Sequence, residues 1–189
     1  MSVESQRRAQ LVEATIREIG TVGSLDVTVG QIAKRAGVSS ALAFHYFGGK
    51  DSLLLAAMQH TLTIYGAQVR GALAMSHGSR ERLEAVIRVS FIPTNFRSDV
   101  IAAWLNFYVL AQRSKRARRL LTIYHRRLHS NLVHDLKPLI GDRAPVVAER
   151  LGGLIDGLYV RSAITPKRVS GEDATSHVLA ALDRELDAA

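Results

Sequence analysis

Cysteine is missing from this chain of 189 residues, which excludes disulfide bridges and thiol chemistry. Proline is scarce, with four residues, and no Gly/Ser-rich tract marks a linker. No apolar run approaches the roughly 20 residues of a membrane-spanning helix, and the N-terminal segment MSVESQRRAQ lacks the apolar stretch of a secretory signal. These absences predict a compact cytoplasmic protein that does not enter a membrane.

Motifs of the common enzyme classes are also missing. The chain has no P-loop, no G-x-G-x-x-G fingerprint and no G-x-S-x-G nucleophile turn. His125 and His129 have the i, i+4 spacing of a metal-binding pair on a helix, but the surrounding arginines would repel a cation. We therefore expect neither catalysis nor a bound metal or cofactor.

Apolar residues recur at helical spacing along the whole chain, and no strand-like alternation persists. Because 47% of the residues are hydrophobic, the chain can bury a core of ordinary size. Pro138 should end one long helix, and Pro145 should lie in the first turn of the next. The prediction is an all-α protein with helices at about 5–22, 28–36, 40–47, 50–75, 79–92, 98–113, 115–137, 144–165 and 170–187.

Residues 28–50, TVGQIAKRAGVSSALAFHYFGGK, carry the most specific pattern in the chain. Thr28 and Gln31 have the spacing of a capping box, which starts a helix. Gly37 can adopt the positive φ that ends this helix, and Ser39 can cap a second, short helix. Two short helices joined by a tight turn form a helix-turn-helix unit, which places its second helix in the DNA major groove.

This segment resembles the DNA-binding head of the TetR family of transcriptional repressors. The resemblance implies an all-α protein in two parts: a three-helix helix-turn-helix head at 1–48, and a helical-bundle body at 49–189 that binds a small-molecule effector and dimerises. An ordinary helical hairpin with a glycine turn is the alternative reading of the same local pattern. The matching residues are Thr28, Ile32, Ala33, Ala36, Gly37, Val38, Ser39, His45, Tyr46, Phe47 and Lys50.

The side chains of this segment divide by the part of DNA that they could touch. Hydroxyls and a charge at the helix starts and in the tail suit phosphate oxygens, whereas the outer face of the second helix suits base edges. Many family members carry Tyr where this chain has Phe44, so one hydroxyl contact is missing here. The expected phosphate contacts are Thr28, Ser39, Tyr46 and Lys50, and the expected base contacts are Ser40, Ala41, Phe44 and His45.

The formal charge of +8 suits a nucleic-acid partner, but the predicted head is not the most basic part of the chain. Residues 1–50 hold six basic and four acidic side chains, whereas no acid lies between Asp99 and Asp135. That second stretch is either a solvated helix face or part of the field that attracts DNA or another partner. Its basic cluster consists of Arg113, Lys115, Arg116, Arg118, Arg119, Arg126 and Arg127.

Dimerisation, which the resemblance implies, would use the last two long helices before the C-terminal tail. Gly152, Gly153 and Gly157 would let helix backbones approach closely, and a helix-interior Gly costs about 1 kcal/mol relative to Ala, so three of them indicate a packing reason. A contact within one chain is the alternative. A dimer would present two recognition helices one DNA turn apart and require a near-palindromic operator. The expected ridges are Leu128, Leu132 and Leu136, and Leu151, Leu154, Ile155 and Leu158.

Three segments of the body look like the BetI branch of the family, in which the effector is choline and the regulated genes make glycine betaine. These segments are residues 103–107, 126–133 and 154–161. The resemblance therefore implies a choline-responsive repressor of double-stranded DNA. A TetR-type repressor that responds to a different small molecule is the first alternative, and a nonspecific architectural DNA-binding protein is the second.

Aromatic residues give separate support for a cationic effector. Trp104, Phe107 and Tyr108 fall on one helix face, and the aromatic face of a ring attracts a quaternary ammonium by roughly 0.5–2 kcal/mol per contact. Asp156 could complete such a site, or it could pair with an arginine on its own helix, and an aromatic stripe could equally belong to the core. The candidate ligand-binding residues are Phe91, Asn95, Trp104, Phe107, Tyr108, Tyr124, Asp156 and Tyr159.

Overall fold

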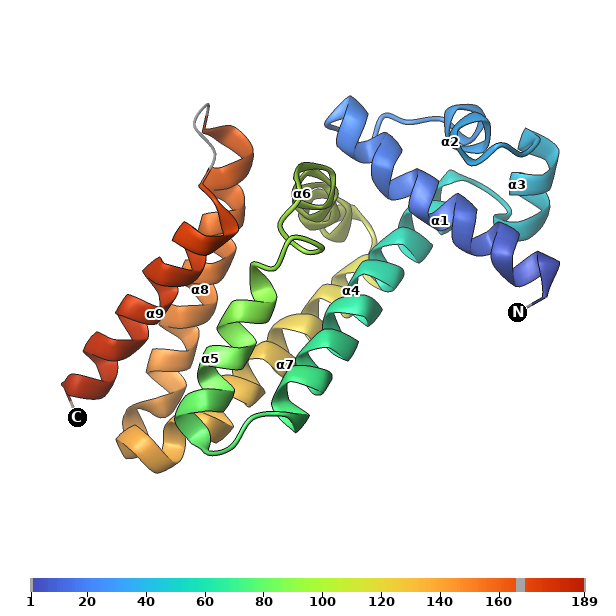
Figure 1. The fold of residues 1–189 in the computed structure, drawn as a ribbon. Helices are drawn as coiled ribbons and strands as arrows, with labels where there is room; N and C mark the ends of the chain where they lie inside the picture. The colour runs from blue at the N-terminus through green and yellow to red at the C-terminus, as the bar shows by residue number, and fades with distance from the viewer. Residues whose placement is uncertain (1, 166–168, 189) are drawn as a thin grey trace. The chain divides into compact units, whose positions relative to one another are not determined.

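The computed structural model describes residues 2–165 and 169–188, and the chain folds into helices throughout this part, with no strand in it (Figure 1). The all-α prediction is confirmed. None of the helices in the described ranges is both long and apolar enough to cross a membrane. The elements are α1 (Val3–Val22), α2 (Val29–Ala36), α3 (Ser40–Phe47), α4 (Lys50–Ala74), α5 (Ser79–Ser90), α6 (Ser98–Arg113), α7 (Lys115–Ile140), η1 (Gly141–Arg143), α8 (Ala144–Ile164) and α9 (Gly171–Asp187).

The chain forms two compact units. Unit 1 comprises residues 1–63 and 98–121, and unit 2 comprises residues 64–97 and 122–189. The helices α4 and α7 therefore contribute to both units, and α6 belongs with the predicted helix-turn-helix head. The division predicted at residues 48 and 49 concerns which part binds DNA and which binds an effector, and it stays a prediction.

In unit 1, the helix α1 packs against both α2 and α6. Its buried face carries Leu11, Ile16 and Ile19, and Phe107 of α6 is fully buried in the same unit. The two helices approach closely at Gly20, because a Cβ added there would lie 2.4 Å from the Cβ of Asp99. A side chain at position 20 would therefore push α6 away from α1.

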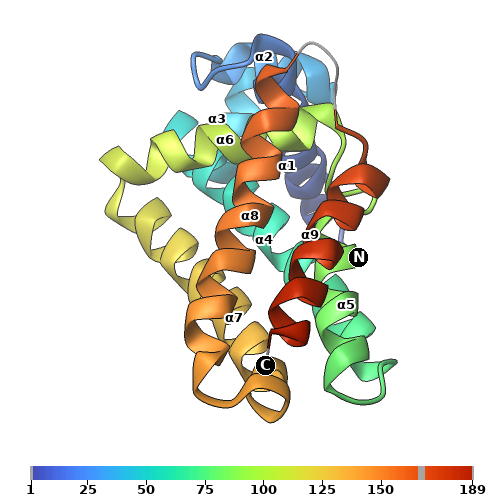
Figure 2. The same ribbon diagram turned by 90° about the vertical axis from the view of Figure 1, so that its left-hand side faces the viewer.

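In unit 2, the helix α9 lies beside α8 and also contacts α5 (Figures 1 and 2). Charged side chains reinforce these contacts: the carboxylate of Glu185 accepts hydrogen bonds from Arg143 and Arg150, at 2.8 Å each. Arg82 of α5 likewise donates to Asp135 of α7 at 2.8 Å, and that carboxylate is almost fully buried. Removing one partner of a buried pair leaves an uncompensated charge, so this ion pair fixes how α5 and α7 meet.

Two expectations about the long helices were wrong. The helix α7 does not stop before Pro138 but continues to Ile140. Proline lacks the N–H that would bond to the carbonyl four residues earlier, and its ring crowds that carbonyl. Only two residues of α7 follow Pro138, so the disturbance is confined to the end of the helix. The expected dimer ridges are also largely used inside one chain, because Leu132, Leu136, Leu151 and Ile155 are buried in it, with at most 1% of each exposed.

Candidate nucleic-acid interface and ligand site

The segment between α1 and α4 has the hydrogen bonds of a helix-turn-helix unit. Thr28 Oγ1 accepts from the backbone N–H of Gln31 at 3.1 Å, and the Gln31 side chain accepts from the Thr28 N–H at 2.7 Å. Gly37 ends α2 with a φ of 67°, in the left-handed region that a glycine adopts without strain. Ser39 Oγ then accepts from the N–H of Leu42 at 3.1 Å and starts α3. The predicted capping box, turn and second cap are all confirmed.

The helix α3 has one buried and one exposed face. Ala43, on the inner face of α3, is fully buried and belongs to the core. The four residues predicted to face base edges, Ser40, Ala41, Phe44 and His45, are all exposed. Phe44 is 51% exposed, so its ring is available for contact with a partner.

The four predicted phosphate contacts differ in how free their polar groups are. The Thr28 hydroxyl accepts from one backbone N–H and donates to Gln31 Oε1 at 2.8 Å, so it acts first as a cap. The Ser39 hydroxyl only accepts in its cap, so its hydrogen can still be donated to a phosphate oxygen. Tyr46 and Lys50 are half-buried near the end of α3 and at the start of α4.

Arg8 of α1 contacts the C-terminal end of α3, which the sequence did not reveal. Its guanidinium lies 4.8 Å from the ring centre of Phe47 and 5.8 Å from that of Tyr46, and Nη1 donates to the Tyr46 carbonyl at 2.9 Å. Cation–π contacts of this kind contribute about 0.5–1 kcal/mol each at exposed sites. Arg8 therefore fixes the C-terminal end of α3 to α1. No pattern in the sequence connects positions 8 and 46, because only the tertiary fold brings them together.

A second link joins α2 to α1. The guanidinium of Arg35 forms an ion pair with Glu18, whose residue is only 8% exposed, and its Nη2 donates to Thr21 Oγ1 at 3.2 Å. Because the carboxylate is largely withdrawn from water, it needs this partner. The pair holds α2 at a fixed angle to α1, and α2 in turn supports α3.

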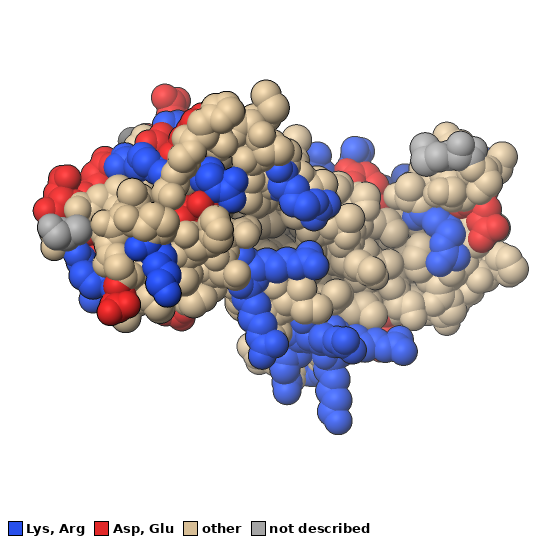
Figure 3. Space-filling model, turned by 90° about the horizontal axis from the view of Figure 1, so that it is seen from below, with Lys and Arg blue, Asp and Glu red and all other residues tan. Residues whose placement is uncertain are grey.

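The basic cluster of residues 113–127 lies on the surface, and all seven side chains are exposed. Figure 3 shows Lys and Arg side chains gathered on one part of the surface, with few Asp or Glu side chains among them. One member has a structural role, since Arg118 donates from Nε to the Ala111 carbonyl at 3.1 Å and from Nη2 to the Gln112 carbonyl at 2.9 Å. It thereby satisfies carbonyls at the C-terminal end of α6.

The eight predicted ligand-binding residues belong to different compact units. Trp104, Phe107 and Tyr108 lie in unit 1, where the first two are buried and the rings of Trp104 and Tyr108 are 6.0 Å apart. Phe107 is fully buried and is a core residue of that unit. The other five lie in unit 2 and are Phe91, Asn95, Tyr124, Asp156 and Tyr159.

Aromatic rings in unit 2 form a continuous network. Phe91, Phe96 and Tyr159 pack on one another with centroid distances of 5.0–5.9 Å. The Tyr159 hydroxyl donates to the Ser90 carbonyl, and Asn95 Nδ2 donates to the Val89 carbonyl at 2.8 Å. Asn95 thus holds the chain between α5 and α6 in place. A ligand-binding role for it stays a prediction.

A second pair of rings adjoins a carboxylate. Tyr65 of α4 and Tyr124 of α7 pack edge to face with centroids 5.5 Å apart. Asp156 of α8 lies near them: its Oδ2 is 3.4 Å from Nε2 of His125, and its charge contributes to the raised pKa of Tyr65. The other oxygen, Oδ1, is buried, and no residue in ranges 2–165 and 169–188 donates a hydrogen bond to it. A buried carboxylate oxygen without a donor is costly and is a place where a cation would be favoured.

We predict that Tyr65 makes stability depend on alkaline pH. Burial of the hydroxyl, together with the nearby charge of Asp156, raises the pKa of Tyr65 to about 12 from an ordinary 10.0, while the hydrogen bond with Ser90 opposes the shift. The raised pKa means that the folded state retains a proton that the unfolded state loses. Stability is therefore complete below pH 10 and falls between about pH 10 and 12. Urea unfolding of the wild type and of Tyr65→Phe at each pH should show a steeper decline for the wild type, and parallel curves would contradict the prediction.

Comparison with known families assigns both parts of the chain. Residues 11–57 match the bacterial regulatory proteins of the tetR family, and residues 79–187 match the C-terminal domain of BetI-type transcriptional repressors. The second match covers more than half of the chain. The two matched segments include all of α2, α3 and α5–α9.

Individual proteins agree with these matches. The HTH-type transcriptional regulator BetI of Brucella anthropi is 53% identical over 165 residues, which are 87% of this chain and 85% of that protein. The regulator of the same name from Agrobacterium fabrum is 48% identical over 87% of this chain and 80% of its own length.

Among solved structures, a transcriptional regulator from Pseudomonas aeruginosa superposes with a TM-score of 0.82 at 26% identity, covering 97% of this chain and 91% of its own. One from Saccharomonospora viridis, solved in complex with choline, has a TM-score of 0.83 at 21% identity, with 95% and 96% covered. At that identity the second likeness shows the fold alone.

Proposed function

This chain belongs to the TetR family of DNA-binding transcriptional regulators and to its BetI-type branch. From this we propose that it binds a near-palindromic operator as a homodimer. We also propose that the binding of a choline-like cation changes its affinity for the operator. Repression of genes for choline and glycine betaine metabolism is the proposed outcome. The proposal places the protein in the cytoplasm, where its DNA lies, and gives it no catalytic step.

The exposed face of α3 supports the DNA-binding part of the proposal. Ser40, Ala41, Phe44 and His45 point to solvent from a helix that α1 and α2 hold in place. Phosphate contacts would come from the Ser39 hydroxyl, Tyr46 and Lys50, and the Thr28 cap would orient the N-terminus of α2. Arg8 would act indirectly by fixing the end of α3 that carries Tyr46.

The carboxylate of Asp156 carries the effector part of the proposal. Its buried Oδ1 has no donor in the described part of the chain, and the rings of Tyr65 and Tyr124 lie in the same cluster. A quaternary ammonium has no N–H to donate, so it is bound by a negative charge and by aromatic faces. The regulator from Saccharomonospora viridis, which shares the fold, was solved with choline. The helix α4 carries both Lys50 and Tyr65, so it is the element through which we propose that the cation acts on DNA binding.

The proposal is tested by titrating duplex DNA with the full-length protein. The duplex is one recovered by selection from a random pool, and its binding is followed by fluorescence anisotropy at fixed ionic strength. Saturating choline should change the dissociation constant by at least tenfold, whereas ethanolamine, which lacks the three methyl groups, should have little effect. An unchanged constant with choline, and a changed one with a different metabolite, would favour the TetR-type alternative. Equal affinity for every duplex would favour a nonspecific architectural protein.

Glycines on α8 support the homodimer. A Cβ added at Gly152, Gly153 or Gly157 would meet no atom within 4 Å, so contacts within one chain do not require glycine there. Gly153 is exposed, and Val146 and Val160 of the same helix are 56% and 43% exposed. Since glycine weakens a helix, its presence is explained if the backbone of a second copy packs against this face.

We predict that Gly153→Leu weakens the dimer at least tenfold, because the new side chain would separate the two α8 backbones. Gly71→Leu is the matched control: Gly71 is also an exposed glycine inside a helix, and a Cβ there also meets nothing within 4 Å. Both changes should raise helix propensity by about the same amount, on the order of 1 kcal/mol. Sedimentation equilibrium of both variants measures the effect. Equal dissociation constants for the two variants would place the dimer contact elsewhere.

A further inference from the structure

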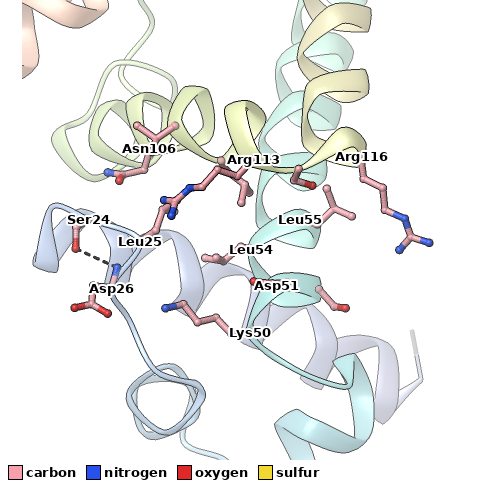
Figure 4. Close-up of a pocket in the computed structure, with 14 residues that line it drawn as sticks. Ser24, Leu25, Asp26, Lys50, Asp51, Leu54, Leu55, Asn106, Arg113 and Arg116 are labelled. Atoms are coloured by element: carbon pink, nitrogen blue, oxygen red, sulfur yellow. Dashed lines mark hydrogen bonds between the residues drawn. The ribbon is translucent and has the colours of Figure 1, made fainter.

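A cavity of about 710 Å³ lies within unit 1, at a place that the proposed function does not use (Figure 4). Three segments of that unit line it: the Ser24–Asp26 loop between α1 and α2, the first turns of α4, and the C-terminal part of α6 with the start of α7. Asn106 Nδ2 donates to the carbonyls of Gly23 and Ala102, at 3.3 and 2.9 Å, and so ties the loop to α6. The cavity is therefore part of a fixed arrangement within this unit.

Charged side chains of both signs line the cavity, and the basic ones exceed the acidic ones by one. Lys50, Arg113 and Arg116 line it, against the two carboxylates of Asp26 and Asp51. Figure 4 shows Lys50 and Arg113 extending toward the Ser24–Asp26 loop from different elements. Across residues 2–165 and 169–188, no ion pair is formed by any of these three basic side chains. The positive end of the α4 dipole lies at Lys50 and adds to the excess of positive charge.

The rest of the wall mixes apolar side chains with the uncharged polar groups of Ser24, Ser52, Asn106 and Ser114. Leu54 and Leu55 of α4 face the cavity, as do Val109 and Leu110 of α6. The volume is in the range of small-molecule sites, which are mostly apolar with a few placed polar groups. Leucines beside unpaired guanidinium and ammonium groups fit an organic anion: its carboxylate would take hydrogen bonds from Arg113 and Lys50, and its hydrocarbon part would lie against the leucines.

We propose that this cavity is a second ligand site that binds a small organic carboxylate. Binding of the carboxylate lowers the affinity of the protein for its operator DNA. Its ligand has the opposite charge to the cation proposed for unit 2. The link to DNA is Lys50, because its ammonium group is the proposed phosphate contact and also lines the cavity. An anion bound to Lys50 removes that group from the operator, and by linkage operator DNA weakens the binding of the anion by the same factor. This link rests on the proposed role of Lys50, whereas binding of the anion itself does not.

Binding is tested with benzoate, and benzamide serves as the uncharged analogue of the same shape. The readout is the backbone amide NMR signals of Ser24, Leu25 and Asp26 in the full-length protein without DNA. Benzoate should shift these signals with a dissociation constant at least fivefold lower than that of benzamide. Arg113→Ala should weaken benzoate at least fivefold. Arg119→Ala removes an exposed arginine of the same basic cluster that does not line the cavity, and it should leave benzoate binding unchanged.

The effect on DNA is tested separately by anisotropy at constant ionic strength. Benzoate should weaken operator binding at least threefold in the wild type and not in Arg113→Ala. Loop signals that do not move, equal affinities for benzoate and benzamide, or equal benzoate affinities in Arg113→Ala and Arg119→Ala would overturn the site. Benzoate binding that leaves operator affinity unchanged would overturn the link through Lys50. Failure to bind any duplex without benzoate would contradict the proposed function instead, and the NMR titration would still test the site.

Discussion

Ala41→Glu is expected to reduce operator binding at least 100-fold, which corresponds to roughly 3 kcal/mol. Ala41 is exposed in the first turn of α3, on the face that we propose enters the major groove. A carboxylate there would be repelled by the phosphates of both strands, and it would lose its hydration against the base edges. The same carboxylate in the first turn of a helix interacts favourably with the helix dipole, so the fold should not suffer. Anisotropy titration with a selected duplex measures the loss, and circular dichroism verifies the fold.

Gln112→Glu is the matched control for this change. Gln112 is also exposed in unit 1, near the end of α6, and the substitution adds the same negative charge to that unit. If net charge alone decides affinity, the two variants should bind operator equally weakly. We expect the control to stay within threefold of the wild type. A folded Ala41→Glu protein that binds as well as Gln112→Glu would exclude α3 as the reading helix.

Asp156→Asn should weaken choline binding at least tenfold. The substitution keeps the shape of the side chain but removes the negative charge beside Tyr65 and Tyr124. The attraction of this partly buried carboxylate for a cation is the largest favourable contribution that we assign to the site. The new amide can still accept a hydrogen bond, so the packing around α8 should be retained. Isothermal titration of the full-length protein with choline measures the change.

Asp142→Asn removes the same charge from an exposed position in η1 of unit 2 and should leave choline affinity unchanged. It separates a local role of Asp156 from a general effect of net charge. Equal choline affinities in the two variants would show that Asp156 is not a ligand of the cation. If titration of the wild-type protein with choline gives no heat of binding, choline is excluded as the effector. Other cations would then be titrated into the same two variants.

The local features of the helix-turn-helix segment could be predicted from the sequence because each depends on a few neighbouring residues. The Thr28–Gln31 box, the positive φ of Gly37 and the Ser39 cap are set by spacings of two or three positions. Which residues of α3 face solvent follows from helical periodicity, and the exposure of Phe44 agrees with it. These parts of the structure need no knowledge of long-range packing.

Contacts between distant positions could not be predicted in this way. Arg8 reaches Tyr46 over 38 residues, and Lys50 lines one cavity with Arg113, but neither pair has a pattern in the chain. The roles of aromatic residues were ambiguous for the same reason: Phe107 and Tyr159 were both candidate ligand-binding residues, yet Phe107 is a core residue of unit 1 and Tyr159 joins a ring network in unit 2. A helical stripe indicates that a face is buried, but it does not indicate what covers it.

The leucine ridges illustrate the same limit for assembly. Leu132 and Ile155 have the spacing of either an intramolecular core or a dimer seam, and in the structure they are buried within one chain. The glycines of α8 are more informative once the structure is known, because the space around Gly153 shows that its own chain does not require glycine.

Hydroxyl-radical footprinting of the protein on its selected duplex is the most direct test of the central proposal, which is that two copies of α3 occupy successive turns of the DNA. We predict two protected regions with centres about 10 base pairs apart, related by the symmetry of the site. Both should vanish with Ala41→Glu and change in extent when choline is added. Protection that is continuous along any duplex, or that survives Ala41→Glu unaltered, would contradict it.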